Sequence, residues 1–130
     1  MPTPSKYWRE IPQRFRFEAG KCTRCGHLAF PPRLVCPVCG NREFAPHKLA
    51  ETGKLLTYTI VRVAPGSFED EAPYAVGIAQ LADGVKLTAQ VVDCAFADLK
   101  VWMDVRLEFR KMSEDGPAGV ISYGYKFVPA

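Results

Sequence analysis

The sequence predicts a mainly β protein that consists of a short N-terminal helix, a metal-binding ribbon and a five-stranded barrel. Two observations predict this arrangement: two pairs of closely spaced cysteines, and after them five β-rich segments separated by turn residues. We expect a docking segment over residues 1–19, the ribbon over residues 20–50 and the barrel over residues 51–130. A chain of 130 residues has room for one domain with an appendage or for two very small domains.

The ribbon is predicted from the cysteine pattern C-x2-C-x10-C-x2-C, formed by Cys22, Cys25, Cys36 and Cys39. Gly26 and Gly40 follow the two pairs, so the backbone can adopt positive φ there and turn its N–H groups towards the sulfurs. Two such turns facing each other place four sulfurs at tetrahedral positions, which suits Zn²⁺ or iron. Disulfides or a redox motif are the alternative, but no helix-forming pattern follows either pair as a thioredoxin-like site requires.

The ribbon is too short to bury enough surface to fold alone, so we expect the metal to supply the missing stability. Arg33 follows Phe30-Pro31-Pro32, so it projects from a stiff turn, either as a phosphate contact or as an ordinary surface residue. We expect His27 and His47 to be surface residues, because four sulfurs already saturate a tetrahedral site.

Positive charge is concentrated in the N-terminal part of the chain. Residues 1–54 hold ten Lys/Arg and four Asp/Glu, a net charge of +6. Residues 55–130 hold seven Lys/Arg and ten Asp/Glu, a net charge of −3. A basic surface favours a partner that carries phosphates, either a nucleic acid or a nucleotide-like cofactor, although a merely solvated surface can have the same composition.

An aromatic stripe precedes the ribbon. Ser5 is placed to cap a short helix that begins at Lys6, and Pro12 limits how regular this helix can be. Helical spacing places four large side chains on one face: Tyr7, Trp8, Ile11 and Phe15. Such an exposed stripe either folds back on its own domain or grips another subunit.

The barrel is predicted from five segments rich in β-branched and aromatic residues, at 55–63, 74–81, 85–92, 101–112 and 120–128. Asp83-Gly84 predicts a two-residue hairpin turn, and residues 93–100 predict a short connector with one helical turn. Gly77 lies in the middle of a strand, where a small barrel needs a sharp bend or a close backbone approach. Five short strands with a connector between the third and fourth predict an OB-fold.

Recognisable catalytic patterns are absent from the sequence, which has no G-x-S-x-G, no phosphate-binding glycine loop and no paired carboxylates beside a histidine. Cys94 has no histidine near it in the sequence, so we expect a small buried apolar residue rather than a nucleophile. The acidic run Glu69–Glu71 is expected to be a solvated loop. No apolar run approaches the roughly 18 residues of a membrane helix, and the start of the chain has no apolar stretch like that of a signal peptide. With four of five cysteines in metal spacing, these features indicate a reducing, cytoplasmic location.

Six short motifs together resemble a known family: Trp8-Arg9-Glu10, Cys22-x-x-Cys25-Gly26, Phe30-Pro31-Pro32-Arg33, Cys36-Pro37-x-Cys39-Gly40, Pro73-Tyr74 and Tyr123-Gly124-Tyr125-Lys126-Phe127. This is the family of OB-fold proteins with an N-terminal rubredoxin-like zinc ribbon, long labelled as of unknown function. The resemblance covers nearly the whole chain, and the Phe-Pro-Pro-Arg box between the cysteine pairs is its most specific part. The chain departs from the family at Trp102-Met103, where relatives often have Gly-Met, so this edge of the barrel differs in shape and is a candidate partner contact.

The resemblance implies a non-catalytic subunit of a thiolase-type acyl-CoA complex that forms or cleaves carbon–carbon bonds. It implies one structural Zn²⁺, a CoA thioester as ligand, and a hetero-oligomer with a thiolase-like subunit. On this hypothesis we expect Arg24 and Arg33 to contact the phosphorylated nucleotide end of CoA. The partner-binding residues would be Tyr7, Trp8 and Phe15.

Two alternatives remain at this level. The first is nucleic-acid binding, because a ribbon followed by an OB-fold is a common architecture of RNA-binding proteins; the net acidic barrel argues against it. The second is rubredoxin-like electron transfer with iron in place of zinc, which would leave the barrel without a role. We expect no contact with a membrane.

Overall fold

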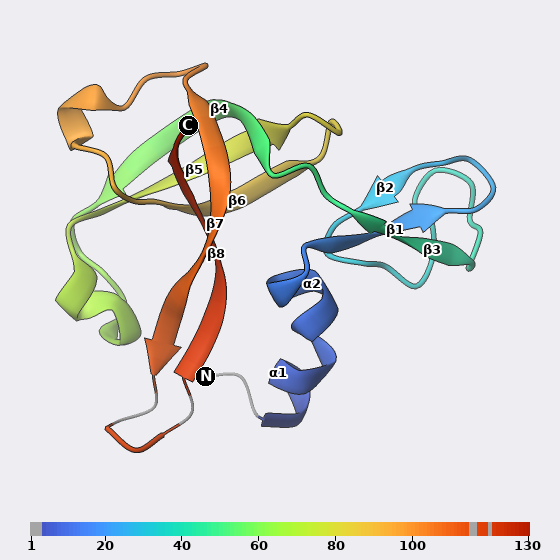
Figure 1. The fold of residues 1–130 in the computed structure, drawn as a ribbon, viewed down its shortest axis with the longest axis horizontal. Helices are drawn as coiled ribbons and strands as arrows, with labels where there is room; N and C mark the ends of the chain where they lie inside the picture. Colours follow the sequence, from blue (N-terminus) through green and yellow to red (C-terminus); the bar gives the residue numbers. More distant parts are fainter. Residues whose placement is uncertain (1–3, 115–116, 120) are drawn as a thin grey trace. The chain divides into compact units, whose positions relative to one another are not determined.

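The computed structural model describes residues 4–114, 117–119 and 121–130, and this part of the chain is mainly β (Figure 1). The chain divides into two compact units, the first ending at Leu49 and the second running from Ala50 to the C-terminus. Two α-helices begin the first unit, α1 (Pro4–Arg9) and α2 (Ile11–Phe15). The α-helices of the described part are far too short to cross a lipid bilayer.

The first helix begins two residues earlier than predicted. It starts at Pro4 rather than Lys6, so Ser5 lies inside α1 and the prediction that it caps the helix is wrong. Proline suits a first helical turn, because that turn does not use the missing N–H and the ring already fixes a helical φ. Glu10 then separates α1 from α2, two residues before Pro12, which is the irregularity expected of a proline at that position.

The rest of the first unit is a three-stranded antiparallel sheet in the order β2-β1-β3. Its strands are β1 (Glu18–Cys22), β2 (Leu28–Ala29) and β3 (Phe44–Lys48). Cys22 at the end of β1 is paired with Phe44 at the start of β3, and Gly20 is paired with Ala29 of β2. The sheet therefore brings the first cysteine pair next to the chain that leaves the second pair.

Five strands form the second unit: β4 (Thr52–Val61), β5 (Tyr74–Leu81), β6 (Lys86–Val91), β7 (Asp104–Glu114) and β8 (Ile121–Pro129). They close into a barrel in the order β4-β5-β6-β8-β7. All neighbours are antiparallel except β6 and β8, which pair in parallel where Val91 meets Phe127. Pairing of Gly53 with Val105 joins β4 to β7 and completes the barrel. The predicted fold class, mainly β with an N-terminal ribbon and a five-stranded OB-fold barrel, is confirmed.

The interior of the barrel is apolar and closely packed. Leu55, Val105 and Phe127 have no exposed surface. Gly77 of β5 faces this interior, and a Cβ atom there would lie 2.6 Å from Leu55 Cδ1 and 3.0 Å from the carbonyl oxygen of Thr57. The close approach predicted for this glycine is therefore confirmed, because no other residue fits without displacing its neighbours.

Two connections differ in how well the sequence predicted them. A hairpin turn lies where Asp83-Gly84 predicted it, but its loop has three residues, 82–84, rather than two. The N–H of Leu81 donates to the carbonyl oxygen of Val85, and the N–H of Gly84 donates to that of Leu81, both at 2.8 Å. Gly84 closes the loop with a φ of +87°. The fourth barrel strand, β7, begins at Asp104 rather than at the predicted residue 101. Trp102 has a φ of +70°, which takes the backbone out of the extended conformation just before the strand. Glycine adopts such a conformation more readily than tryptophan does.

Short 3₁₀ helices form parts of two connections in the barrel unit. The segment η1 (Gly66–Glu71) contains the acidic run, whose residues are all exposed as predicted. Glu71 is nevertheless tied to the barrel, because its carboxylate accepts a hydrogen bond from the Gln90 amide at 3.3 Å. The segment η2 (Phe96–Asp98) forms the single helical turn predicted between the third and fourth barrel strands.

Candidate metal centre

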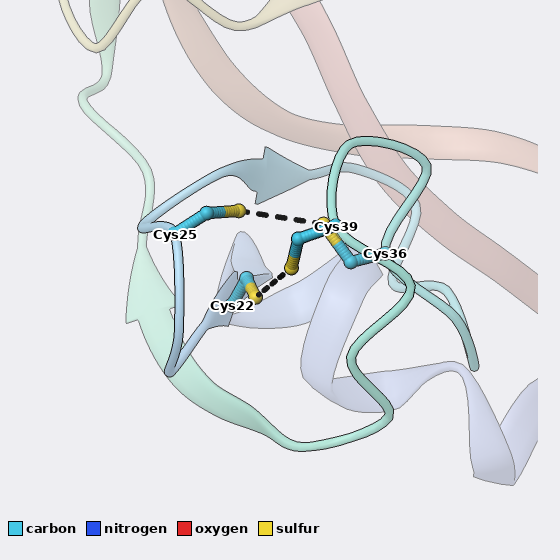
Figure 2. Close-up of side chains that lie close together, drawn as sticks. All are labelled: Cys22, Cys25, Cys36 and Cys39. Atoms are coloured by element: carbon cyan, nitrogen blue, oxygen red, sulfur yellow. Dashed lines mark hydrogen bonds between the residues drawn. The ribbon is translucent and has the colours of Figure 1, made fainter.

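The four cysteine sulfurs converge on one point in the first unit. Figure 2 shows the side chains of both pairs turned towards one another. The Sγ atoms of Cys22 and Cys39 are 3.5 Å apart, as are those of Cys25 and Cys36. All four sulfurs lie within 4.8 Å of one another. Within the described residues, these four cysteines form the group of side chains that could bind a metal ion.

Matching turns hold the two cysteine pairs. The N–H of Gly26 donates to the carbonyl oxygen of Cys22 at 3.0 Å, and the N–H of Gly40 donates to that of Cys36 at the same distance. Gly26 and Gly40 have φ angles of +78° and +76°, so the positive φ predicted for both is confirmed. Because each turn needs a left-handed residue at its end, glycine lets the chain leave the metal without a clash of Cβ with the backbone.

One residue beside the sulfurs was not identified from the sequence. Asn41 Nδ2 is 3.5 Å from Cys22 Sγ and also donates to Thr23 Oγ1 and to the carbonyl oxygen of Glu43, both at 3.0 Å. Its amide thus supports one sulfur and joins the two turns. Its sequence signal is weak, because it is only a polar residue directly after Gly40.

The cysteine thiols differ in pKa, because they differ in their hydrogen bonds, burial and neighbouring sulfurs. The backbone N–H of Cys25 lowers the pKa of the Cys22 thiol to about 5, and the Asn41 amide acts in the same direction. The backbone N–H of His27 also lowers the pKa of Cys25, but burial and the neighbouring sulfurs raise it overall, to about 12. Four thiolates this close together repel one another, and a bound cation would stabilise all of them at once.

The geometry fits a tetrahedral zinc site. Zinc–sulfur bonds of about 2.3 Å in a tetrahedron place the sulfurs about 3.8 Å apart. The observed separations, 3.5 Å for two pairs and at most 4.8 Å for the others, bracket that value. Cys22, Cys25, Cys36 and Cys39 would hold the ion, leaving no position for water or substrate. Such a centre organises the ribbon and is not itself a reaction site.

The histidines and the fifth cysteine lie outside this cluster. His27 and His47 are half-buried, and neither imidazole belongs to the metal-binding group of the described residues. Cys94 is only partly buried, so the prediction of a buried apolar residue is wrong for it. It follows Asp93, whose φ of +58° ends the strand and leaves the next residue at the surface. Burial and the nearby Asp98 carboxylate raise the pKa of the Cys94 thiol, which disfavours a nucleophilic thiolate.

The residues predicted to bind CoA lie on the ribbon. Arg24 lies between the first two cysteines and Arg33 in the loop between the two pairs, and both side chains are exposed. Within the described residues, neither guanidinium forms an ion pair. Both guanidinium groups are thus available to an anionic ligand.

The residues predicted to bind a partner lie on the two N-terminal helices. Trp8 on α1 is 73% exposed, whereas Phe15 on α2 is half-buried. The side chain of Tyr7 lies outside what the structure describes. A hollow of about 400 Å³ next to Trp8 is lined by Trp8, Arg9, Ile11, Pro12 and Arg16. The predicted stripe is therefore continued by a concave surface beside the exposed Trp8.

Comparison with known protein families assigns both units. The rubredoxin-like zinc ribbon domain of ChsH2 matches residues 9–45, and the C-terminal OB-fold domain of ChsH2 matches residues 47–110. Together with the four-sulfur cluster, the ribbon match makes the metal a structural zinc, as the resemblance implied.

Individual relatives agree with this assignment. The chain is 45% identical over 123 residues to a DUF35 domain-containing scaffold protein of Methanocaldococcus jannaschii, an alignment that covers 94% of this chain and 87% of the relative. It is 30% identical over 71 residues to the benzoylsuccinyl-CoA thiolase subunit BbsA of Thauera aromatica, covering 55% of this chain and 48% of BbsA. Among solved structures, a chain of the Ltp2-ChsH2(DUF35) aldolase superposes with a TM-score of 0.75 at 27% identity, covering 95% of this chain and 91% of that one. The family resemblance seen in the sequence is confirmed: this chain belongs to the family of DUF35 domain-containing scaffold proteins, with a ChsH2-type zinc ribbon in front of an OB-fold.

Proposed function

We propose that this chain is a non-catalytic subunit of a thiolase-type complex, where it assembles with a thiolase-like subunit and helps it to hold an acyl-CoA. The observation that carries the proposal is the near full-length match to a scaffold protein, combined with the fold of an aldolase complex component. The similarity to a benzoylsuccinyl-CoA thiolase subunit adds the chemical class of substrate, a CoA thioester. The reaction would form or cleave a carbon–carbon bond.

The chemistry of the described residues suits an accessory role. The zinc site is saturated by four sulfurs, so it has no open position at which to activate water or polarise a carbonyl. Cys94 has a raised pKa, and its thiol donates to the carbonyl oxygen of Ala95 rather than to a side-chain base. The nucleophile and the acid–base groups would then come from the thiolase-like subunit.

Coenzyme A binding is proposed for the basic surface of the ribbon. CoA carries several phosphates on its nucleotide end, and Arg24 and Arg33 offer exposed guanidinium groups that can donate paired hydrogen bonds to them. Arg33 directly follows two prolines, so presenting it loses little conformational entropy. The thioester end would then extend into the thiolase-like subunit.

Partner binding is proposed for the aromatic stripe of the N-terminal segment, formed by Tyr7, Trp8 and Phe15. Large aromatic side chains that fill a pocket of a partner are the strongest anchors in protein interfaces. Trp8, at 73% exposure, has most of its surface available for burial.

Co-expression tests the assembly. The tagged chain is co-expressed with the thiolase-like protein of the same genome, and the complex is analysed by gel filtration and by an assay of acetoacetyl-CoA cleavage. We expect a stable complex whose activity depends on both chains. Recovery of RNA in place of the thiolase-like protein would instead support the nucleic-acid alternative and overturn the proposal.

Point variants separate the two surfaces. Arg33→Glu should raise the KM for acetoacetyl-CoA and leave kcat nearly unchanged, because the contact is the same in the ground state and the transition state. Arg62→Glu on the barrel is the matched control, since Arg62 is also exposed. Trp8→Ala should weaken assembly, whereas Val63→Ala, which truncates a 92%-exposed side chain of the barrel, should leave it unchanged. An unchanged KM in Arg33→Glu would show that the ribbon is not part of the CoA site.

A further inference from the structure

The loop that carries the second cysteine pair exposes an unusual amount of aliphatic surface. Leu34 is 88% exposed, Val35 is 45% exposed and Val38 is 67% exposed. These three side chains, here called the ribbon patch, lie within five consecutive residues of the chain. Isolated apolar residues on a surface are ordinary, but three on one short loop form a patch that favours association.

The metal site fixes the backbone of part of this loop. Cys36 lies inside the patch segment and is buried, with its sulfur in the metal-binding cluster. Its N–H donates to the carbonyl oxygen of Asn41 at 2.8 Å, and its carbonyl oxygen accepts from Gly40 at 3.0 Å. Because Cys36 and Cys39 both turn their sulfurs to the metal site, the position of Val38 between them is set, and its side chain is 67% exposed.

Positive charge predominates in the stretch that contains the patch. Residues 19–43 contain Lys21, Arg24, Arg33 and Arg42, against one carboxylate, Glu43. All four cationic side chains are exposed. A loop that exposes apolar side chains within a mostly cationic stretch is complementary to an apolar surface bordered by carboxylates.

We propose that the ribbon patch is a docking surface for the thiolase-like subunit, and that it inserts into an apolar depression bordered by Asp and Glu residues of that subunit. This inference rests on the proposed function for the identity of the partner and names a contact separate from the aromatic stripe. A loop already held by metal coordination loses little entropy on binding, which makes it an effective anchor.

An anionic membrane surface is the other partner that a basic and apolar loop suits. Membrane-interface segments gain most from tryptophan and tyrosine at the headgroup level, and from many basic residues on one amphipathic helix. The ribbon patch has only aliphatic side chains and lies on a tight turn, so the observations favour a protein partner.

The test replaces the patch with acid in the full-length zinc-loaded protein. Leu34→Asp and Val38→Asp are made singly and together, and Val63→Asp is the matched control, because Val63 is a 92%-exposed aliphatic residue of the barrel unit. The dissociation constant for the purified thiolase-like subunit of the same genome is measured by isothermal titration calorimetry. Zinc content and circular dichroism confirm that each variant is folded, which the high exposure of the replaced side chains leads us to expect.

We expect the dissociation constant to be about tenfold higher for each single patch variant, higher still for the double variant, and unchanged for Val63→Asp. Raising the salt concentration should also weaken binding by the wild-type protein, because the charged rims attract each other. Wild-type affinity in the double variant would overturn the docking surface and leave the proposed function standing. Failure of the wild-type protein itself to bind the thiolase-like subunit would overturn the proposed function instead. Binding of the wild-type protein, but not the double variant, to phosphatidylserine vesicles without binding the subunit would identify the patch as a membrane contact and also overturn the inference.

Discussion

Loss of zinc should unfold the ribbon and leave the barrel intact. The perturbation is Cys36→Ser, which removes one of the four sulfurs that lie within 4.8 Å of one another. Apart from cysteines, the large apolar side chains that are buried in the first unit are Phe17, at 7% exposure, and Leu49, at 2%. Burying two such side chains contributes about 3–6 kcal/mol. A structural zinc site contributes about 10–16 kcal/mol, so the metal rather than the core decides whether the ribbon folds.

The barrel has its own supply of buried surface. Leu55, Val105 and Phe127 are fully buried, and five strands close on one another without the ribbon. In a two-dimensional ¹⁵N–¹H spectrum of Cys36→Ser, we therefore expect the amide signals of residues 17–49 to collapse to positions typical of unfolded chains. The signals of residues 50–130 should stay dispersed. Zinc content, measured by mass spectrometry, should fall to zero.

Cys94→Ser is the control for this experiment, because Cys94 lies outside the metal-binding cluster and should keep both the zinc and the full spectrum. Dispersed signals for residues 17–49 in the zinc-free variant would refute the reasoning, since they would show that the small core of the ribbon suffices. Zinc retained at full occupancy by Cys36→Ser would refute the assignment of Cys36 as a ligand.

Three further predictions concern the barrel. Gly77→Ala should lower the free energy of unfolding by about 1–3 kcal/mol in urea titrations, because its Cβ would lie 2.6 Å from a core methyl group. Gly66→Ala should change this free energy little, because a Cβ there meets nothing within 4 Å, and equal effects of the two variants would contradict the packing argument. Glu71→Gln should lower the melting temperature, because Lys126 is only 7% exposed and has its Nζ 4.0 Å from the Glu71 carboxylate. The loss of unfolding free energy should be about 1–2 kcal/mol, below that for breaking a fully buried pair, and Lys126→Met should be neutral or stabilising. Finally, the isolated chain should neither cleave nor condense acetoacetyl-CoA; turnover that Cys94→Ala abolishes would show that the chain is catalytic by itself.

The metal site and the β segments could be predicted because their signals are local. Four cysteines at fixed spacing, each pair followed by glycine, determine a turn that presents sulfur whatever surrounds it. Asp83-Gly84 likewise determines a hairpin turn through backbone conformation alone. Enrichment in β-branched and aromatic residues located all five barrel strands. Their bounds moved by a few residues, and at the start of β7 the reason is that Trp102 leaves the extended conformation.

The remaining features depend on residues that are distant in the sequence. Asn41 supports a sulfur of Cys22 only because the two turns fold against each other, and no spacing rule predicts that contact. Lys126 is charged and yet buried, because Glu71 and Gln90 lie against the strand that carries it. From its residue type alone, a lysine is expected to be exposed to solvent, and only the packed barrel shows that the aliphatic part of this side chain is buried.

By itself, the sequence determined that this protein has a four-sulfur metal ribbon followed by a five-stranded barrel, since both follow from short-range patterns of cysteine, glycine and β-branched residues. The tertiary structure decided which surfaces are left for partners. Leu34 and Val38 are aliphatic, a residue class that is most often buried, yet the folded ribbon leaves them 88% and 67% exposed. Exposure is a property of what packs against a side chain, and in the described structure the chain itself leaves these two side chains uncovered.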